Sequence, residues 1–204
     1  MDLFLLALLG GIACHFFKAQ EQRRRIALLG SVLGQYQIEK LMETLTEGYL
    51  RALGESDPAR REQVWQVLTG CETSLSDQFN RFANEFARVD GALTRVSRLP
   101  LALPWADRLP QSLSFDLREL LKIHARGLAQ SVQGGSAAAG LSPRDRAFQL
   151  SAELFLMQHS CHWYCKSKAV ASARLLARHK TSHAQVLAAV SPETRQAYLA
   201  LVGA

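Results

Sequence analysis

The stretch VWQVLTGCETSLSDQFNRFANEFARVDGALTRV, residues 64–96, carries the clearest pattern in the chain. Its apolar residues recur at spacings of three and four, which places them along one side of an α-helix. Asp57-Pro58, just ahead of it, is a suitable N-cap followed by proline at the first helical position. We therefore expect one long helix that starts at Pro58 and ends before Pro100. The stripe consists of Val64, Leu68, Cys71, Leu75, Phe79, Phe82, Phe86, Val89, Leu93 and Val96.

A helix of this length would measure about 60 Å at 1.5 Å per residue, so its apolar stripe needs long partners. The partner is another helix of the same chain or a second copy of the chain. Helically spaced apolar residues run from Leu29 to Ala52 and stop at Gly54. This pattern predicts a first helix that continues unbroken from residue 3 to residue 53.

Cap residues predict the remaining helices. Asp116-x-x-Glu119 starts a helix near 115–133, and Ser142-Pro143 starts one that runs to about Lys180. Ser191-Pro192 starts a short last helix that ends at about Val202. No segment shows the alternation of a β-strand, and we expect none.

The fold class that follows is all-α. We expect an elongated antiparallel helix bundle with four main helices, a short C-terminal helix and an apolar N-terminal helical extension. Residues 1–25 form an apolar segment with a basic flank, and residues 26–204 form a single helical domain. The sequence GGSAAAG predicts a flexible loop at about 134–142.

The composition is that of an ordinary globular protein, with 48% hydrophobic residues, 21% charged residues and a net charge of +6. The four cysteines are Cys14, Cys71, Cys161 and Cys165. Their wide spacing differs from the dense pattern of a small disulfide-stabilised domain. We expect free thiols in a reducing compartment.

The N-terminal segment from residue 3 to residue 17 contains no charged residue, and on a helical wheel its apolar character extends all round. A helix of this kind is either buried or in contact with lipid. Asp2 precedes the segment and Lys18 follows it, an asymmetry that places the later residues on the cytoplasmic side of a membrane. Its fifteen residues extend only about 22 Å, against roughly 30 Å of bilayer hydrocarbon.

The segment is therefore predicted to be a marginal transmembrane helix or a helix that enters one leaflet. Two alternatives stay open: a buried core or oligomer-contact helix, and a cleaved export signal, for which the basic start and the cleavage site are not evident. The basic residues Arg23, Arg24 and Arg25 would contact lipid head groups. The predicted anchor residues are Leu3, Phe4, Leu5, Leu6, Leu8, Leu9, Ile12, Phe16 and Phe17.

The segment HSCHWYC, residues 159–165, combines two histidines with two cysteines and raises the possibility of a metal site. On one helix, however, Cys161 and Cys165 share the apolar face, whereas His159 lies nearly opposite them. One helix cannot direct all four side chains at one ion, so we predict two core cysteines and two surface histidines. Cys161 and Cys165 remain only weak candidates for a metal or redox site.

A basic stretch follows, because no acidic residue occurs between Glu153 and Glu193. Lys166, Arg174 and Arg178 fall on one side of the predicted helix. Such a face suits phosphate groups, whether of anionic lipid, nucleic acid or an acidic protein, and it is also common on ordinary solvated helices.

No phosphate-binding loop, nucleophile elbow or zinc-protease motif occurs, and no motif indicates a cofactor. His124, alone on an apolar stripe, is interpreted as a hydrogen-bonded core residue. The expected function is non-enzymatic: a helical scaffold or adaptor tethered to the inner membrane, with most of the chain in the cytoplasm, that binds a protein partner or itself. The alternative is a soluble helical module that binds nucleic acid or another polyanion through residues 166–180.

Overall fold

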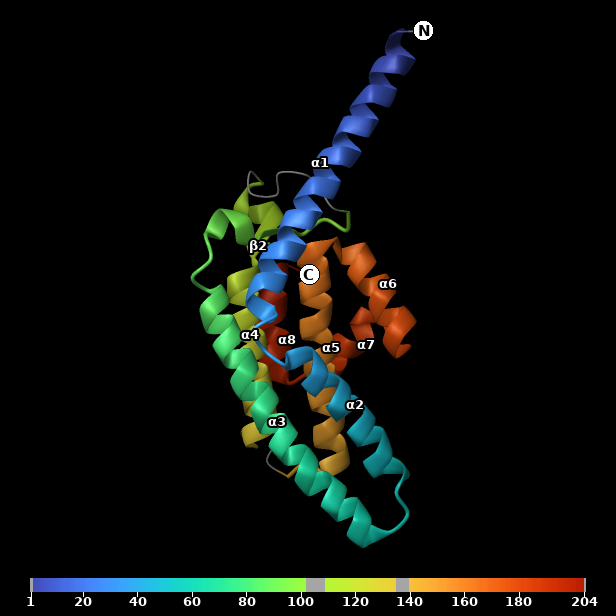
Figure 1. Cartoon of the computed structure of the whole chain (residues 1–204), viewed down its shortest axis with the longest axis vertical. Coiled ribbons are helices and arrows are strands. Elements are labelled where there is room, and N and C mark those ends of the chain that lie inside the picture. Colours follow the sequence, from blue (N-terminus) through green and yellow to red (C-terminus); the bar gives the residue numbers. More distant parts are fainter. Residues whose placement is uncertain (1, 102–108, 135–139, 204) are drawn as a thin grey trace.

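The computed structural model describes residues 2–101, 109–134 and 140–203, with side chains from residue 4 onward (Figure 1). The all-α expectation is confirmed, since the described chain folds into eight α-helices and a single pair of very short strands. Part of the predicted loop at 134–142, residues 135–139, lies outside the described residues.

Eight helices follow one another along the described chain. They are α1 (Asp2–Leu33), α2 (Ile38–Gly54), α3 (Pro58–Phe86), α4 (Leu117–Gln133), α5 (Pro143–Cys165), α6 (Lys168–His179), α7 (His183–Ala189) and α8 (Pro192–Val202). Two 3-10 turns, η1 (Gly91–Thr94) and η3 (Gln111–Leu113), precede the strands β1 (Arg95–Ser97) and β2 (Ser114–Asp116).

The predicted caps are present at four helices. The side chains of Asp57, Asp116, Ser142 and Ser191 each accept a hydrogen bond from a backbone N–H in the first turn of α3, α4, α5 and α8. These bonds satisfy donors that a helix start leaves without intrahelical partners. At its other end α4 stops at Gly134, whose φ of 69° few other residues adopt.

The prediction of one unbroken helix from residue 3 to 53 is wrong. The chain turns between Leu33 and Ile38, and α2 then runs beside α3, which returns in the opposite direction (Figure 1). Side chains of α3 hold this turn: the Tyr36 hydroxyl donates to Glu85 at 2.7 Å, and the backbone N–H of Gln37 donates to Gln78 at 2.7 Å. Tertiary contacts with α3 therefore hold the break, which falls at Gly34, the residue after the end of α1.

The long helix that starts at Pro58 ends at Phe86 rather than near Pro100. The last residue of the stripe, Val96, lies in β1 and pairs with Phe115 of the antiparallel strand β2. These strands of three residues are too short to show an alternating pattern, which is why the sequence did not predict them. Thr94 donates to Asp116 at 2.8 Å and secures the turn before the strand pair.

The helix predicted from Ser142 to about Lys180 is divided in two. It ends at Cys165, and Ser167 caps a new helix by accepting a hydrogen bond from the backbone N–H of Val170. A further helix, α7, was also missed. Its start carries a capping box, in which the side chains and backbone of Ser182 and Gln185 bond reciprocally.

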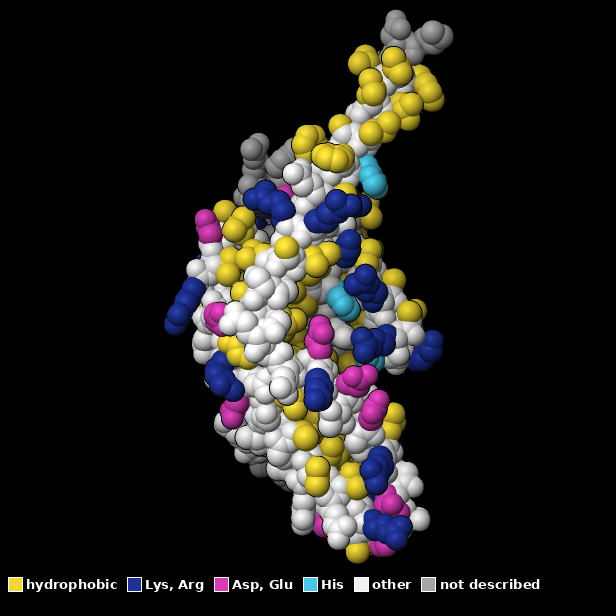
Figure 2. All heavy atoms as spheres, in the orientation of Figure 1, with side chains coloured by type: hydrophobic (Ala, Val, Ile, Leu, Met, Phe, Trp, Pro, Cys, Tyr) yellow, Lys and Arg dark blue, Asp and Glu magenta, His cyan; other side chains and the backbone are white. Residues whose placement is uncertain are grey.

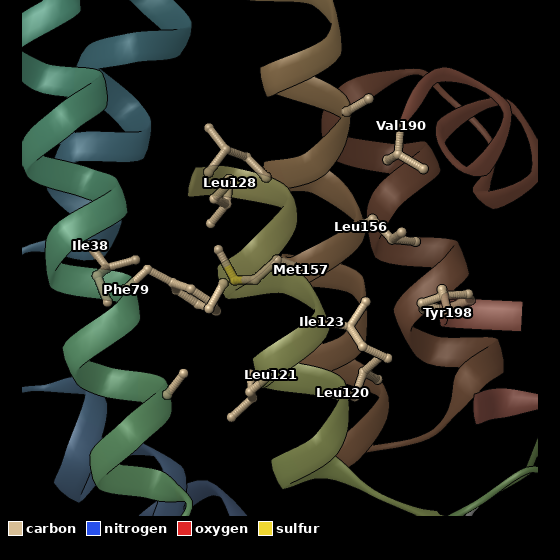
Figure 3. Close-up of a cluster of buried hydrophobic side chains, with 14 of the residues drawn as sticks. Ile38, Phe79, Leu120, Leu121, Ile123, Leu128, Leu156, Met157, Val190 and Tyr198 are labelled. Carbon is tan, nitrogen blue, oxygen red and sulfur yellow. The ribbon is translucent and has the colours of Figure 1, made fainter. Parts of the chain in front are cut away.

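The core lies where α3, α4 and α5 run side by side (Figure 1). Figure 3 shows Ile38 and Phe79 pointing toward Met157, with Leu121 and Leu128 of α4 nearby. Within the chain, the apolar stripe of α3 is buried by these neighbours, most completely at Leu68, Leu75, Phe79, Phe82 and Phe86.

One polar contact in this core joins α4, α5 and α8. Glu153 of α5 is completely buried, and its Oε1 accepts a hydrogen bond of 3.0 Å from the backbone N–H of Ser191, at the start of α8. Burial raises the pKa of the Glu153 carboxyl above its ordinary value. Space for this carboxyl exists because α4 carries glycine at position 127. A Cβ there would lie 2.7 Å from Glu153 Oε2 and also against Thr194 Oγ1.

We predict that Gly127→Ala destabilises the protein by about 1–3 kcal/mol, because the added methyl overpacks the Glu153–Thr194 contact. This effect outweighs the gain of up to about 1 kcal/mol that alanine brings to a helix interior. Gly70→Ala on α3 is the matched control, since its Cβ would meet no atom within 4 Å. Urea unfolding should show the first variant destabilised and the second unchanged or more stable; equal behaviour of the two would contradict the packing described.

Candidate functional site

The N-terminal half of α1 projects beyond the body of the protein and contacts little of it (Figure 1). Every residue from 4 to 17 is exposed, and large apolar side chains cover this half in Figure 2. Their exposed fractions reach 76% at Phe4 and 65% at Phe16. Soluble monomers rarely show such a continuous apolar surface. It consists of Phe4, Leu5, Leu6, Leu8, Leu9, Ile12, Phe16 and Phe17, while the side chain of Leu3 lies outside the described residues.

Among the described residues, no helix combines the length and the apolar character needed to cross a membrane. This finding gives no support to the transmembrane helix that was one of the sequence predictions. Association of α1 with a membrane stays a prediction. Its support must come from the exposure of the apolar side chains and from the basic residues that follow them.

From Lys18 onward α1 approaches the body, and Arg25 is its main polar contact there. The Arg25 guanidinium bonds Glu21 at 2.9 Å, donates to the backbone oxygen of Tyr164 at 3.2 Å, and lies 5.2 Å from the centre of the Tyr164 ring. Only 13% of its side chain is exposed. Arg25 therefore fixes α1 to the end of α5, whereas the sequence suggested a head-group contact. Arg23 and Arg24 are exposed.

Lys166, Arg174 and Arg178 were predicted to share one basic face of a single helix. The break after α5 puts Lys166 between two helices and the two arginines on α6. Lys166 lies between the helices, is half-buried, and donates to Gln22 of α1 at 3.2 Å. Arg174 and Arg178 are exposed on α6. Lys166 and Arg174 line the same cleft between α1 and α6, but Arg178 does not.

Of the histidines and cysteines of residues 159–165, Cys161, His162 and Cys165 line this cleft, whereas His159 lies apart from it. Cys161 and Cys165 are free thiols at this cleft, and burial raises the pKa of the Cys165 thiol to about 11. His162 is half-buried, but His159 is buried, so the prediction of a surface histidine at that position is wrong. The helices α6 and α7 cover the side of α5 that a single-helix projection assigns to solvent. Within the described part of the chain, no group of three or more histidine, cysteine or acidic residues could hold a metal ion.

Buried histidines form a polar cluster between α4, α5, α6, α7 and α8. His124 lies 2.9 Å from Ser160, which itself donates to a backbone oxygen, so the His124 Nε2–H is the donor of that contact. His159 contacts Ser172 at 3.0 Å and stacks on His183 at 4.3 Å between ring centres. Burial lowers the pKa of His124 and of His159 to about 3. The interpretation of His124 as a hydrogen-bonded core residue agrees with this geometry.

Comparison with family models, with curated proteins and with solved structures finds no match to this chain. The function must therefore be argued from the site alone. Two surface features stand out on the described residues: the exposed N-terminal half of α1, and the cleft beside its C-terminal half. The sequence indicated the first through its uncharged run, but the cleft joins residues of five separate helices and left no sequence signal.

The buried histidines predict that stability decreases with acid. A pKa lowered in the folded state gives a contribution that is complete above the unfolded value of about 6.5 and is lost as the pH falls toward 3. For His124 the loss between pH 7 and pH 5 is on the order of 2 kcal/mol. Urea unfolding of His124→Gln should show a correspondingly flatter pH dependence, and His15→Gln, at an exposed position on α1, should leave it unchanged. An identical slope in wild type and His124→Gln would contradict this account.

Proposed function

We propose that this protein is a non-enzymatic helical adaptor tethered to a membrane by the exposed half of α1. In this proposal residues 4–17 insert into the cytoplasmic leaflet of the inner membrane, and the helical body remains at the surface, where it binds a protein partner. The observation that carries the proposal is the exposure of eight large apolar side chains on one projecting helix.

Removal of these side chains from water supplies the driving force. Burial of a large apolar side chain contributes about 1.5–3 kcal/mol, so eight partly exposed ones together contribute on the order of 10 kcal/mol. Residues 4–17 extend about 21 Å, more than half of the roughly 30 Å of bilayer hydrocarbon. The helix is therefore long enough to enter one leaflet fully.

Lipid fits this helix better than a protein groove does. A groove covers one face of a helix, whereas the apolar residues of α1 surround it on all sides. An apolar helix without a polar face enters the bilayer end-on rather than lying in its plane. Lys18, Arg23 and Arg24 follow the apolar residues directly, at the depth where lipid phosphates would lie. Figure 2 shows Lys and Arg side chains gathered where this helix meets the body of the protein.

The end of the body farthest from the α1 tip is available to a partner. The hairpin of α2 and α3 forms this end (Figure 1), and it exposes Leu50, Leu53 and Val67, with exposed fractions of 68%, 51% and 70%. Exposed apolar side chains on a helical surface suit contact with an apolar groove of a protein partner. In the tethered molecule this hairpin would point away from the membrane.

A second candidate function is the binding of nucleic acid or another polyanion by α6. The exposure of Arg174 and Arg178, one helical turn apart, favours it. Such binding depends steeply on salt, because each phosphate contact releases counterions. Binding that weakens strongly between 50 and 200 mM salt, and weakens further in Arg174→Ala plus Arg178→Ala, would favour this function over the membrane tether.

We predict that serine at Leu5, Leu8, Leu9 and Ile12, hereafter the α1 serine variant, moves the protein from the membrane fraction to the supernatant. The wild type should stay with membranes through a high-salt wash and an alkaline carbonate wash, because apolar insertion depends little on charge. The measurement is cell fractionation followed by immunoblotting of each fraction.

The matched control carries serine at four equally exposed apolar positions of the body: Leu50, Val67, Phe148 and Leu176. It removes a similar apolar surface without touching α1 and should remain with the membranes. If the wild type were already in the supernatant, or if both variants behaved alike, α1 would not be the tether.

A further inference from the structure

A cleft of about 290 Å³ lies where α1, α2, α3, α5 and α6 approach one another. Figure 2 shows apolar side chains at its position between α1 and α6, with a histidine and Lys or Arg side chains beside them. The volume is at the lower end of the roughly 300–1,000 Å³ that small-molecule sites occupy. Its lining is mainly apolar and includes Leu29, Leu33, Ile38, Met42, Phe82 and Met157.

One side of the cleft is basic. Lys166 and Arg174 both line it, and among the described residues neither has an acidic partner within ion-pair distance. Glu39 of α2 is the acid of the lining, so two cations stand against one carboxylate. The combination of an apolar floor with unneutralised cations at one edge is complementary to an apolar chain that ends in an anion.

We propose that this cleft binds a single-chain anionic amphiphile, such as a long-chain fatty acid or an alkyl phosphate. The chain packs along Leu29, Ile38 and Met157, and the anionic head lies at Lys166 and Arg174. Met42 and Met157 suit such a chain, because unbranched methionine adapts to ligands of variable shape.

Other occupants fit the cleft less well. A peptide brings a backbone N–H and C=O at every residue, and these groups need partners when buried. The lining offers few such partners, since its polar side chains are those of Glu39, Gln158, His162, Lys166 and Arg174 and the others are mainly apolar. Gln158 is also engaged by His179, at 2.9 Å. A second copy of the chain would bring its own net positive charge to a basic edge.

This inference does not depend on the membrane tether, because the cleft belongs to the folded body. Binding is therefore measured on the full-length α1 serine variant, which lacks four of the eight exposed large apolar side chains of α1, to which an acyl chain could adhere nonspecifically. Failure of the tether in cell fractionation would leave this experiment intact, and failure here would leave the tether intact.

The probes share one sixteen-carbon chain and differ in the head group: palmitate, hexadecyl phosphate and hexadecanol. Equilibrium dialysis of the radiolabelled compounds below their critical micelle concentrations gives stoichiometry and affinity. We expect saturable binding of one anionic probe per chain, with hexadecanol at least tenfold weaker. Tighter binding of palmitate would indicate a free fatty acid as the natural ligand, and tighter binding of hexadecyl phosphate a phospholipid product; either result supports the proposal.

The steric test uses Gly30, which lines the cleft and whose Cβ would meet no atom within 4 Å. Gly30→Phe adds an aromatic ring to the cleft from a position where the Cβ has open space, and it should weaken palmitate binding at least tenfold. Gly70→Phe is the matched control on α3, where space is equally open but no cleft is present. It should bind palmitate like the parent protein.

The charge test compares two arginines of α6. Arg174→Glu places a carboxylate at the cleft and should weaken palmitate binding roughly tenfold, because a charge-assisted contact is lost. Arg178→Glu makes the same change one turn away, outside the lining, and should have little effect.

Three outcomes would overturn the proposal. The first is binding of palmitate that does not saturate, or no binding at all. The second is equal binding to the Gly30→Phe and Gly70→Phe variants, which would place the ligand elsewhere. The third is hexadecanol binding as tightly as palmitate with no effect of Arg174→Glu, which would remove the role of the cations.

Discussion

The contact of Arg25 with the end of α5 determines the position of α1, on which both the exposed apolar helix and the cleft depend. Its guanidinium bonds Glu21 on its own helix, donates to the Tyr164 backbone oxygen, and stacks on the Tyr164 ring. The bond to a backbone oxygen at a helix C-terminus is favourable, because carbonyls there lack intrahelical partners. This contact fixes the point at which α1 leaves the body.

Two features follow from that point of departure. The residues of α1 before Phe17 project beyond the described part of the body, so their apolar side chains remain exposed. The residues after Arg25 form one wall of the cleft, which α2, α3, α5 and α6 complete. The proposed tether is thus the N-terminal half of α1, and the C-terminal half of the same helix forms one wall of the proposed ligand site. An amphiphile in the cleft would lie close to the surface that α1 is proposed to enter.

The sequence predicted well what local chemistry controls. Asp57, Asp116, Ser142 and Ser191 cap the helices that follow them, as their side chains suggested. The uncharged run in α1 forms the exposed apolar surface, although its sequence alone left a buried helix open as an alternative. A closer search for capping boxes would have found Ser182 and Gln185, and with them α7.

What depends on tertiary contacts was not predictable. The turn after α1 is held by residues of α3, including Gln78 and Glu85, that lie more than forty positions away along the chain. The break at Ser167 placed α6 over the face of α5 that a helical wheel assigns to solvent, and this buried His159. The cleft required both of these breaks, so no pattern along the sequence could indicate it.

The central claim, that the exposed half of α1 enters lipid, is tested most directly at Cys14. This thiol is exposed on that helix, whereas burial raises the pKa of Cys161 and Cys165, so the latter react slowly. In a Cys71→Ala background, an environment-sensitive fluorophore on Cys14 is mixed with anionic vesicles that carry nitroxide-labelled acyl chains. The account predicts a blue-shifted emission that the acyl-chain nitroxides quench. An emission that vesicles neither shift nor quench would contradict it.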